Sequence, residues 1–298
     1  MNPGLAYAFL AYVLWGLFPL YFRQVAAVPA LEIVLHRSVW ALLVLLLLLT
    51  ALRRWSWLRD VLGRPRQLAL FALSALLLSG NWLMYVWAVN HHRVIDASLG
   101  YFINPLVSVL LGYAVLHERL RRVQWAAVAL AAAGVVWLTW RAGQLPWIAL
   151  VLAVSFGLYG LMRKTASLGA LEGLALETLL LAPIALPLLA WWTLQGTSAL
   201  ASGDLSLIAW LVLAGPLTAV PLLLFAAGAR RITMATLGLL QYIAPTIQLL
   251  LGVWLYREPF DASRLAGFAM IWTALGIYSA EGWWTLRRRT ATVALPAV

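Results

Sequence analysis

The stretch LGYFINPLVSVLLGYAVLHE at residues 99–118 recurs in the same order as LGLLQYIAPTIQLLLGVWLYRE at residues 237–258. Three residues reappear at an offset of 140: Pro105 as Pro245, Gly112 as Gly252 and Glu118 as Glu258. The Leu-Gly pair that opens each stretch is offset by 138, so two residues are inserted between the blocks. Upstream, ALE at 30–32 matches ALE at 170–172. The consistent order and spacing indicate a duplicated unit of about 140 residues.

The composition explains what kind of unit is duplicated. Of 298 residues, 64% are hydrophobic and only 10% are charged, and the mean hydropathy is +0.91. A soluble domain is about 45–50% apolar and about 25% charged, so this chain cannot cover a water-facing surface. The composition excludes a soluble enzyme, a nucleic-acid reader and a disordered protein. The absence of cysteine excludes disulfides and thiolate metal sites.

The hydropathy pattern predicts an all-α integral membrane protein. A membrane helix needs about 20 predominantly apolar residues. Ten segments meet this description, and turn or charge signals separate them. The predicted spans are residues 5–22, 31–52, 67–89, 97–116, 123–140, 147–162, 170–192, 207–228, 235–256 and 263–283.

The duplication divides the ten spans into two sets of five. Because five is odd, the second set enters the membrane from the opposite side, so the repeats are inverted. We therefore predict two units, residues 1–145 and residues 146–298. Inverted repeats are typical of secondary transporters, whose sites lie near the midplane between the repeats. This is the main physical argument for transport by alternating access.

The net charge of +11 reflects orientation rather than a nucleic-acid partner. With a cytoplasmic amino terminus, the loops and tail on the inside hold 15 Lys and Arg residues, against 5 in the outside loops. Cytoplasmic loops carry an excess of basic residues. The chain is therefore expected in the bacterial inner membrane with both termini cytoplasmic.

Polar side chains recur on one face of matched spans. At helical spacing, Tyr101 and Ser108 share a face, with Asn104 beside it, and Gln241 and Gln248 share the corresponding face in the second half. Lipid offers such groups no partners, so they face protein or water. Two interpretations remain, a cavity wall and close helix packing. Asn81 and Tyr85, and the aromatic stripes that hold Phe18 and Tyr159, carry the same two alternatives.

Two ionisable residues lie inside predicted spans at matched positions, Arg37 and Glu177. Such residues are candidates for function. The inverted repeat places Arg37 toward the outside and Glu177 toward the cytoplasm, so a direct pair between them is not expected. Arg37 either binds a substrate carboxylate or lies at headgroup level. Glu177 either carries a coupling proton or extends to the interface near Arg163 and Lys164.

The remaining acidic residues and the last span of each repeat suggest structural roles. Glu118 and Glu258 precede short turns, where a carboxylate can cap the exposed amides of the next helix. The spans at 123–140 and 263–283 are nearly free of polar side chains. Small residues recur every four positions in the first of them, as in Ala127 with Ala131 and Ala129 with Ala133. These spans are expected to serve as scaffold or as the contacts of a homodimer.

The segment NWLMYVWAVNHHRVIDASLGYFINPL at 81–106 resembles the RarD branch of the EamA-type transporters, in the drug/metabolite transporter superfamily. LQYIAPT at 240–246, REPF at 257–260 and PGLAYAFLAYVLWGLFPLYF at 3–22 resemble further motifs of that branch. The resemblance implies a ten-helix inner-membrane fold of two inverted repeats around a central cavity, and export or exchange of small metabolites, amino acids or drug-like molecules. It adds Asn90, His91 and Tyr242 as cavity candidates and places Asp96 at the outer interface. The predicted substrate-binding set is Asn81, Tyr85, Asn90, Tyr101, Asn104, Ser108, Tyr159, Gln241, Tyr242 and Gln248.

Other classes of function fit less well. An intramembrane enzyme acting on lipid needs paired catalytic residues, and the chain has no HExxH motif. Asn104-Pro105 is followed by Leu106, whereas a water-channel motif would continue with Ala. The repeat unit of such a channel also has three helices, not five. A scaffold would not need polar stripes in both halves. We therefore expect a non-enzymatic transporter without cofactor, metal or nucleic-acid partner, which contacts membrane lipid and a neutral, zwitterionic or aromatic solute.

Overall fold

A computed structural model describes residues 2–90, 94–142, 147–255 and 262–293, and these form helices with no strand. Leu and Ala are strong helix formers, and they are frequent in the long helices. The helices of the first half are α1 (Pro3–Gly16), α2 (Phe18–Gln24), α3 (Ala30–Ala51), α4 (Ser56–Leu62), α5 (Pro65–Asn90), α6 (Val94–Leu116) and α7 (Arg122–Ala142). Those of the second half are α8 (Trp147–Thr165), α9 (Ala170–Leu194), η1 (Ala199–Ser202), α10 (Leu205–Ala229), α11 (Met234–Leu240), α12 (Ile243–Leu250), the π-helical η2 (Leu251–Leu255) and α13 (Ala262–Val293).

Eight helical segments in the described residues are long and apolar enough to cross a membrane: Pro3–Gln24, Ala30–Ala51, Pro65–Tyr85, Arg122–Arg141, Trp147–Thr165, Ala170–Ser202, Leu205–Ala229 and Met234–Leu255. Eight of the ten predicted spans fall on these segments. The predicted span at 97–116 lies in α6, where the apolar part Gly100–Leu116 is shorter, and the one at 263–283 lies in α13. The all-α membrane class is therefore confirmed at the level of eight candidate spans.

Two predicted spans are broken at proline. The first divides into α1 and α2 at Leu17, two residues before Pro19. The ninth divides into α11 and α12, and Pro245 follows the break at Gln241 and Tyr242. Proline lacks an amide hydrogen, and its ring crowds the carbonyl four residues earlier, which for Pro245 is that of Gln241. Such breaks are tolerated in membrane proteins where protein or water satisfies the freed backbone.

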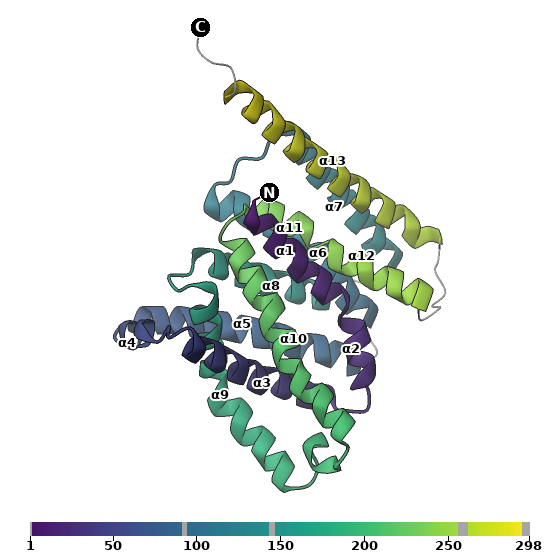
Figure 1. Cartoon of the computed structure of the whole chain (residues 1–298). Coiled ribbons are helices and arrows are strands. Elements are labelled where there is room, and N and C mark those ends of the chain that lie inside the picture. The colour runs from purple at the N-terminus through teal and green to yellow at the C-terminus, as the bar shows by residue number, and fades with distance from the viewer. Residues whose placement is uncertain (1, 91–93, 143–146, 256–261, 294–298) are drawn as a thin grey trace.

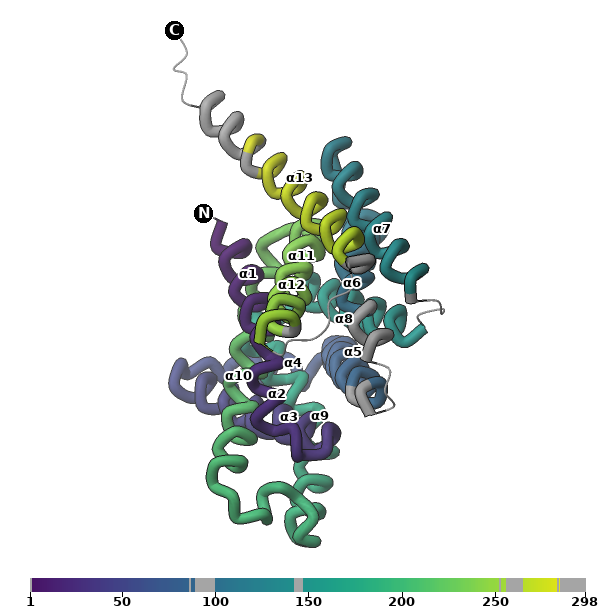
Figure 2. Tube along the Cα trace, turned by 90° about the vertical axis from the view of Figure 1, so that its right-hand side faces the viewer, coloured from purple at the N-terminus to yellow at the C-terminus, as the bar shows by residue number. Residues whose placement is uncertain are grey.

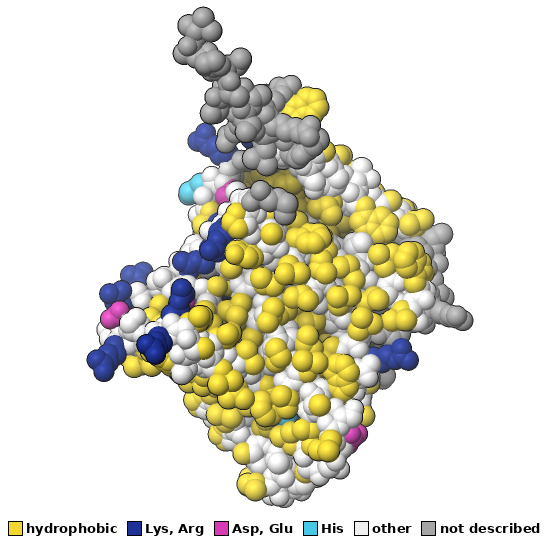
Figure 3. All heavy atoms as spheres, viewed as in Figure 1, with side chains coloured by type: hydrophobic (Ala, Val, Ile, Leu, Met, Phe, Trp, Pro, Cys, Tyr) yellow, Lys and Arg dark blue, Asp and Glu magenta, His cyan; other side chains and the backbone are white. Residues whose placement is uncertain are grey.

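The helices pack as a bundle whose halves interleave (Figures 1 and 2). From the first half, α1 packs on α10 and α12, and α3 packs on α9 and α10. From the second half, α8 packs on α5 and α6. A space-filling view shows apolar side chains over most of one face, with Lys and Arg gathered along the edge that carries α4 (Figure 3). The core therefore lies between the halves, and the apolar surface suits a lipid surrounding.

α7 and α13 lie side by side at one edge of the bundle (Figures 1 and 2). Ala127 and Ala131 are fully buried and belong to the same apolar cluster as Ile271 of α13. A methyl group on Gly134 would lie 2.9 Å from the carbonyl oxygen of Gly267, so the two backbones approach closely. One small-residue stripe is therefore used as scaffold within the chain, which is one of the two roles expected for these spans. The other stripe, at Ala129 and Ala133, is exposed.

Candidate functional site

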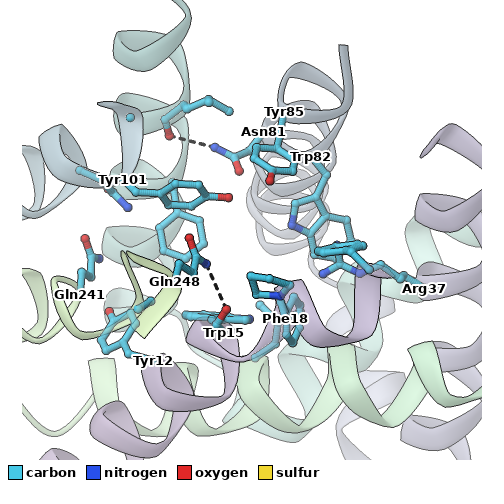
Figure 4. A pocket seen from close by; sticks show the side chains of 18 residues that line it. Tyr12, Trp15, Phe18, Arg37, Asn81, Trp82, Tyr85, Tyr101, Gln241 and Gln248 are labelled. Atoms are coloured by element: carbon cyan, nitrogen blue, oxygen red, sulfur yellow. Dashed lines mark hydrogen bonds between the residues drawn. The ribbon is translucent and has the colours of Figure 1, made fainter. Parts of the chain in front are cut away.

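A cavity of about 150 Å³ lies between the two halves of the chain (Figure 4). Its wall comes from α1, α2, α3, α5 and α6 of the first half, and from α8, α10 and the α11–α12 break of the second. The lining residues are Tyr12, Trp15, Phe18, Pro19, Phe22, Arg37, Asn81, Trp82, Tyr85, Gly100, Tyr101, Asn104, Leu152, Phe156, Leu222, Gln241, Ala244 and Gln248. A water needs roughly 10–15 Å³ by this measure, so the space suits several waters or one small solute.

Arg37 lies in the cavity wall, and only 9% of its surface is exposed. Its Nε donates a hydrogen bond to Thr218 Oγ1 of α10 at 3.0 Å. The guanidinium carbon lies 4.4 Å from the ring centre of Trp82 and 5.4 Å from that of Phe18. Aromatic faces attract cations. Figure 4 shows the Arg37 side chain reaching toward both rings.

Four amide side chains line the cavity, and two of them are tied down by hydrogen bonds. Asn81 Nδ2 donates to the carbonyl oxygen of Leu152 at 2.8 Å and to Ser155 Oγ at 2.9 Å. Gln248 Nε2 donates to the carbonyl oxygen of Trp15 at 3.2 Å. The sequence left open whether Asn81 forms part of a cavity wall or of a helix contact. It does both, because it lines the cavity and bonds to α8.

The other two amides keep an acceptor unused. Asn104 Oδ1 and Gln241 Oε1 are buried and have no hydrogen-bond partner in the described residues. Gln241 Nε2 donates to Ser108 Oγ at 3.4 Å, which turns the amide oxygen away from that serine. An unsatisfied buried acceptor costs about 1–3 kcal/mol. Both residues line the cavity, but neither oxygen is accessible to water in this state, so a ligand can satisfy them once their side chains rotate toward it.

Aromatic rings form much of the remaining wall. Tyr85 and Tyr101 meet edge to face with ring centres 6.0 Å apart. The rings of Trp15 and Phe156, from opposite halves, lie 5.7 Å apart. The predicted stripe on the first span included Phe18 but missed Tyr12, Trp15 and Phe22. The missed residues follow helical spacing with Pro19, at positions 12, 15, 19 and 22, so they form the face next to the predicted stripe. The spacing was therefore correct and the choice of face was wrong.

Three predicted site residues lie outside the cavity wall. Ser108 is buried beneath Gln241. The hydroxyl of Tyr242 donates to the backbone oxygen of Phe102 at 3.2 Å, and its ring is buried in the cluster shared with α7 and α13. Tyr159 is buried against Phe225 and faces Glu177. The side chains of Asn90, His91, Asp96 and Glu258 lie outside the described residues.

Glu177 belongs to a buried cluster with Arg163, outside the cavity wall. Each side chain is only 1% exposed, and their closest charged atoms are 3.5 Å apart. Ser74 Oγ donates to Glu177 Oε1 at 2.6 Å. Arg163 also donates to the backbone oxygen of Ala170 at 3.0 Å. The sequence predicted the neighbour correctly but not the burial. Gly173 explains the fit, because a methyl group there would lie 2.2 Å from Arg163 Nη1.

Glu118 caps a helix, but not the next one in the chain. Its carboxylate accepts hydrogen bonds from the amides of Met234 at 2.8 Å and Ala235 at 3.2 Å, which open α11 in the other half. Lys164 Nζ lies 3.8 Å from the same carboxylate. Negative charge stabilises a helix N-terminus. Gly112 leaves room for this approach, since a methyl group there would lie 2.6 Å from Glu118 Oε2.

Comparisons with known proteins agree with this architecture. Residues 2–140 match the model of the EamA-like transporter family. The chain is 48% identical to an uncharacterized transporter of Pseudomonas aeruginosa, with 97% of each chain covered. It is 44% identical to protein RarD of Escherichia coli, over 96% of this chain and 97% of that one. A crystal structure with 20% sequence identity superimposes with a TM-score of 0.70 over 92% of this chain and 96% of the other, which shows the fold alone.

The class of the protein follows from the helices, the cavity and these relatives: it is a multi-pass bacterial membrane transporter. The chain belongs to the RarD branch of the EamA-like transporters, in the drug/metabolite transporter superfamily.

Proposed function

We propose that the chain is a secondary transporter that exports or exchanges small metabolites, amino acids or drug-like solutes across the inner membrane by alternating access. The observation that carries this proposal is the cavity between the halves, lined by Asn104 from one half and Gln241 from the other. Secondary transporters bind their solute at such an interface and rock one half against the other. The aromatic wall and the amides suit neutral, zwitterionic or aromatic solutes.

Ten spans in two inverted repeats, residues 1–145 and 146–298, are part of the proposal. Helix pairs in the structure come in matched sets, as a two-fold relation requires. The packing of α1 on α10 corresponds to that of α8 on α5, and α3 on α10 corresponds to α9 on α5. Each helix also packs directly on its own counterpart in three cases: α3 on α9, α6 on α11 and α7 on α13. These matched pairs support the inverted repeat.

We place both termini in the cytoplasm, and the cavity then opens toward the outside. The lining residues Phe22 and Arg37 lie near the helix ends that the charge distribution assigns to the outer side. The opposite ends are closed by Glu118 on the start of α11 and by the close approach of Gly4 to Ile232, where a methyl group would lie 2.9 Å from that side chain. This arrangement supports an outward-facing state.

An intramembrane lipid enzyme and a passive channel or scaffold are the alternatives. In the described part of the chain, no three His, Asp or Glu side chains cluster as a metal site would require. The buried carboxylate of Glu177 is engaged by Arg163 and Ser74 and lies outside the cavity wall. A channel would need a path at both ends. The exposed stripe at Ala129 and Ala133 is the surface on which a homodimer through α7 would form.

The test is solute flux in proteoliposomes, with amino acids and small aromatic drugs as the panel, with and without a pH gradient. We expect counterflow of at least one solute by the purified protein, and none in empty liposomes. Turnover of a lipid without movement of any solute would overturn the proposal. Glu177→Gln tests the energy source. If transport is coupled to protons through Glu177, the variant retains counterflow but loses the dependence of flux on the pH gradient. If transport is facilitated exchange, flux is independent of the gradient in both the wild type and the variant.

A further inference from the structure

Arg37 is a buried cation whose negative partner is missing from the described part of the protein. The ion pairs there involve other residues, and no Asp or Glu of that part lies within ion-pair distance of Arg37. Burying an unpaired charge is costly, and proteins normally provide a partner. The counter-charge of Arg37 must therefore come from elsewhere, and the cavity that it lines is the open route.

The guanidinium is held so that part of it remains available. Thr218 Oγ1 accepts from Nε, and the rings of Trp82 and Phe18 hold the group within cation–π distance. The two terminal amino groups donate no hydrogen bond to any described residue. Guanidinium groups bind carboxylates through two parallel hydrogen bonds. Arg37 is thus oriented before a ligand arrives, and its free donors match a carboxylate.

The rest of the wall limits what the carboxylate can be attached to. Among the lining residues that the structure describes, Arg37 is the only Lys or Arg, so one negative charge is balanced there and a phosphate dianion is not. Trp15, Phe156 and Tyr101 offer ring surfaces to an apolar body. Asn104 Oδ1 and Gln241 Oε1 accept no hydrogen bond from any described residue.

From this constellation we infer that the cavity binds a small aromatic monocarboxylate, with the carboxylate on Arg37. A ligand that also carries an N–H or O–H donor would satisfy the free amide oxygens of Asn104 and Gln241. The inference rests on the proposed function, which it deepens by naming the charge and shape of the solute. Arg37 is then a specificity-determining residue, since it selects the charged group that the neutral wall cannot.

The test compares benzoate with benzamide, which has the same shape and no charge. A ligand that binds only the folded state raises the thermal denaturation midpoint as its concentration exceeds the Kd. In detergent at constant ionic strength, we expect the purified wild type to bind benzoate about 10- to 100-fold more tightly than benzamide. Arg37→Gln should bind both ligands equally. Arg59→Gln on the exposed helix α4 is the matched control and should retain the wild-type preference.

Further variants keep the inference testable if Arg37→Gln does not fold. Thr218→Val removes the anchor of Nε and should reduce the preference for benzoate, and Arg37→Lys keeps the charge without the paired donors and should do the same. Equal binding of benzoate and benzamide by the wild type, or an unchanged preference in a folded Arg37→Gln variant, overturns the inference. If chloride alone reproduces the benzoate effect, the site is for an inorganic anion, and the inference is also wrong. Solute flux without a benzoate preference would leave the proposed function intact, whereas a benzoate preference without flux of any solute would contradict the proposed function alone.

Discussion

Arg37 and Arg163 are both buried arginines in a membrane bundle, and their surroundings differ in kind. Arg163 has a carboxylate partner in Glu177 and donates to backbone oxygens in the turn before α9. Arg37 has aromatic rings and one hydroxyl around it, and it lines the cavity. Arg163 is neutralised by the protein itself, whereas Arg37 is neutralised by nothing in the described residues.

This difference separates a structural cation from one that faces a ligand. Burial alone does not distinguish them, since both side chains are at most 9% exposed. What distinguishes them is whether the charge and the hydrogen-bond donors are satisfied within the protein. In the proposed inverted repeat, the position that matches Arg37 is Glu177, 140 residues later. At these two matched positions, Arg37 lines the cavity, whereas Glu177 is buried in an ion pair with Arg163.

The largest effect is expected from removing the free amides of the cavity. Asn104→Ala combined with Gln241→Ala should abolish flux without loss of folding, because both side chains line the cavity and their oxygens bond to nothing else described. Flux in proteoliposomes and gel-filtration behaviour in detergent measure the two effects. Thr178→Ala is the control and should retain flux, because this buried hydroxyl bonds only to the backbone of α9 and lies outside the wall. Wild-type flux in the double variant would contradict the cavity assignment.

Among the buried residues outside the cavity wall, which we call the framework, Glu177→Leu should be strongly destabilising. It leaves Arg163 as a buried charge without its partner, and removing one member of a buried pair costs about 3–5 kcal/mol. The thermal denaturation midpoint in detergent measures the loss. Replacing both members, as Glu177→Leu with Arg163→Met, should recover much of it, since no unpaired charge remains. A double variant less stable than Glu177→Leu alone would show that the pair is not the source of the effect.

A smaller effect is expected at Glu118, which joins the end of α6 to the start of α11. Glu118→Ala removes two hydrogen bonds to amides that then lack a cap, at a cost of about 1–2 kcal/mol. Asp204→Ala is the matched control, since Asp204 caps α10 within its own half. Both variants should lower the thermal midpoint, but only Glu118→Ala should also change the rate of counterflow. Equal flux in the two variants would show that Glu118 does not help to close the contact between the two halves.

The smallest effect concerns Tyr242, which lies one residue beyond Gln241 yet outside the cavity. Tyr242→Phe removes the hydrogen bond to the backbone oxygen of Phe102 and should cost about 1 kcal/mol. Flux should stay at the wild-type level. A substantial loss of flux in this variant would place the hydroxyl on the transport path and contradict the assignment of Tyr242 outside the cavity.

Much of the fold could be predicted from the sequence because a membrane imposes simple rules. Apolar length fixed the helices, and eight of the ten predicted spans coincide with helices of sufficient length. The break at Leu17 was not predicted, although Pro19 follows it. Of the matched prolines, Pro245 marks the break at Gln241–Tyr242, whereas α6 continues through Pro105. Membrane helices often continue through proline, as α9 does at Pro183 and α10 at Pro216, so sequence alone does not decide which proline breaks a helix.

The sequence predicted which polar residues share a helix face, but not which of them line the cavity. Asn81, Tyr85, Tyr101, Asn104, Gln241 and Gln248 line the cavity, because polar groups on a recurring face had to meet protein or water. Tyr159 and Ser108 satisfied the same spacing, yet they found partners within the framework. Periodicity gives the direction of a side chain, but not whether a neighbouring helix already fills that direction. The partner of Glu118, 116 residues away, was beyond any local rule.

The most direct test of the contrast between cavity and framework uses the fact that the chain has no cysteine. Asn81→Cys and Ser74→Cys place single thiols seven residues apart on the same face of α5, one in the cavity wall and one beside Glu177. Labelling by a small water-soluble thiol reagent should be fast at position 81, slowed by benzoate and accompanied by loss of flux, and should be absent at position 74. Equal labelling at the two positions, or complete labelling at position 81 with flux unchanged, would contradict a solute path through this cavity.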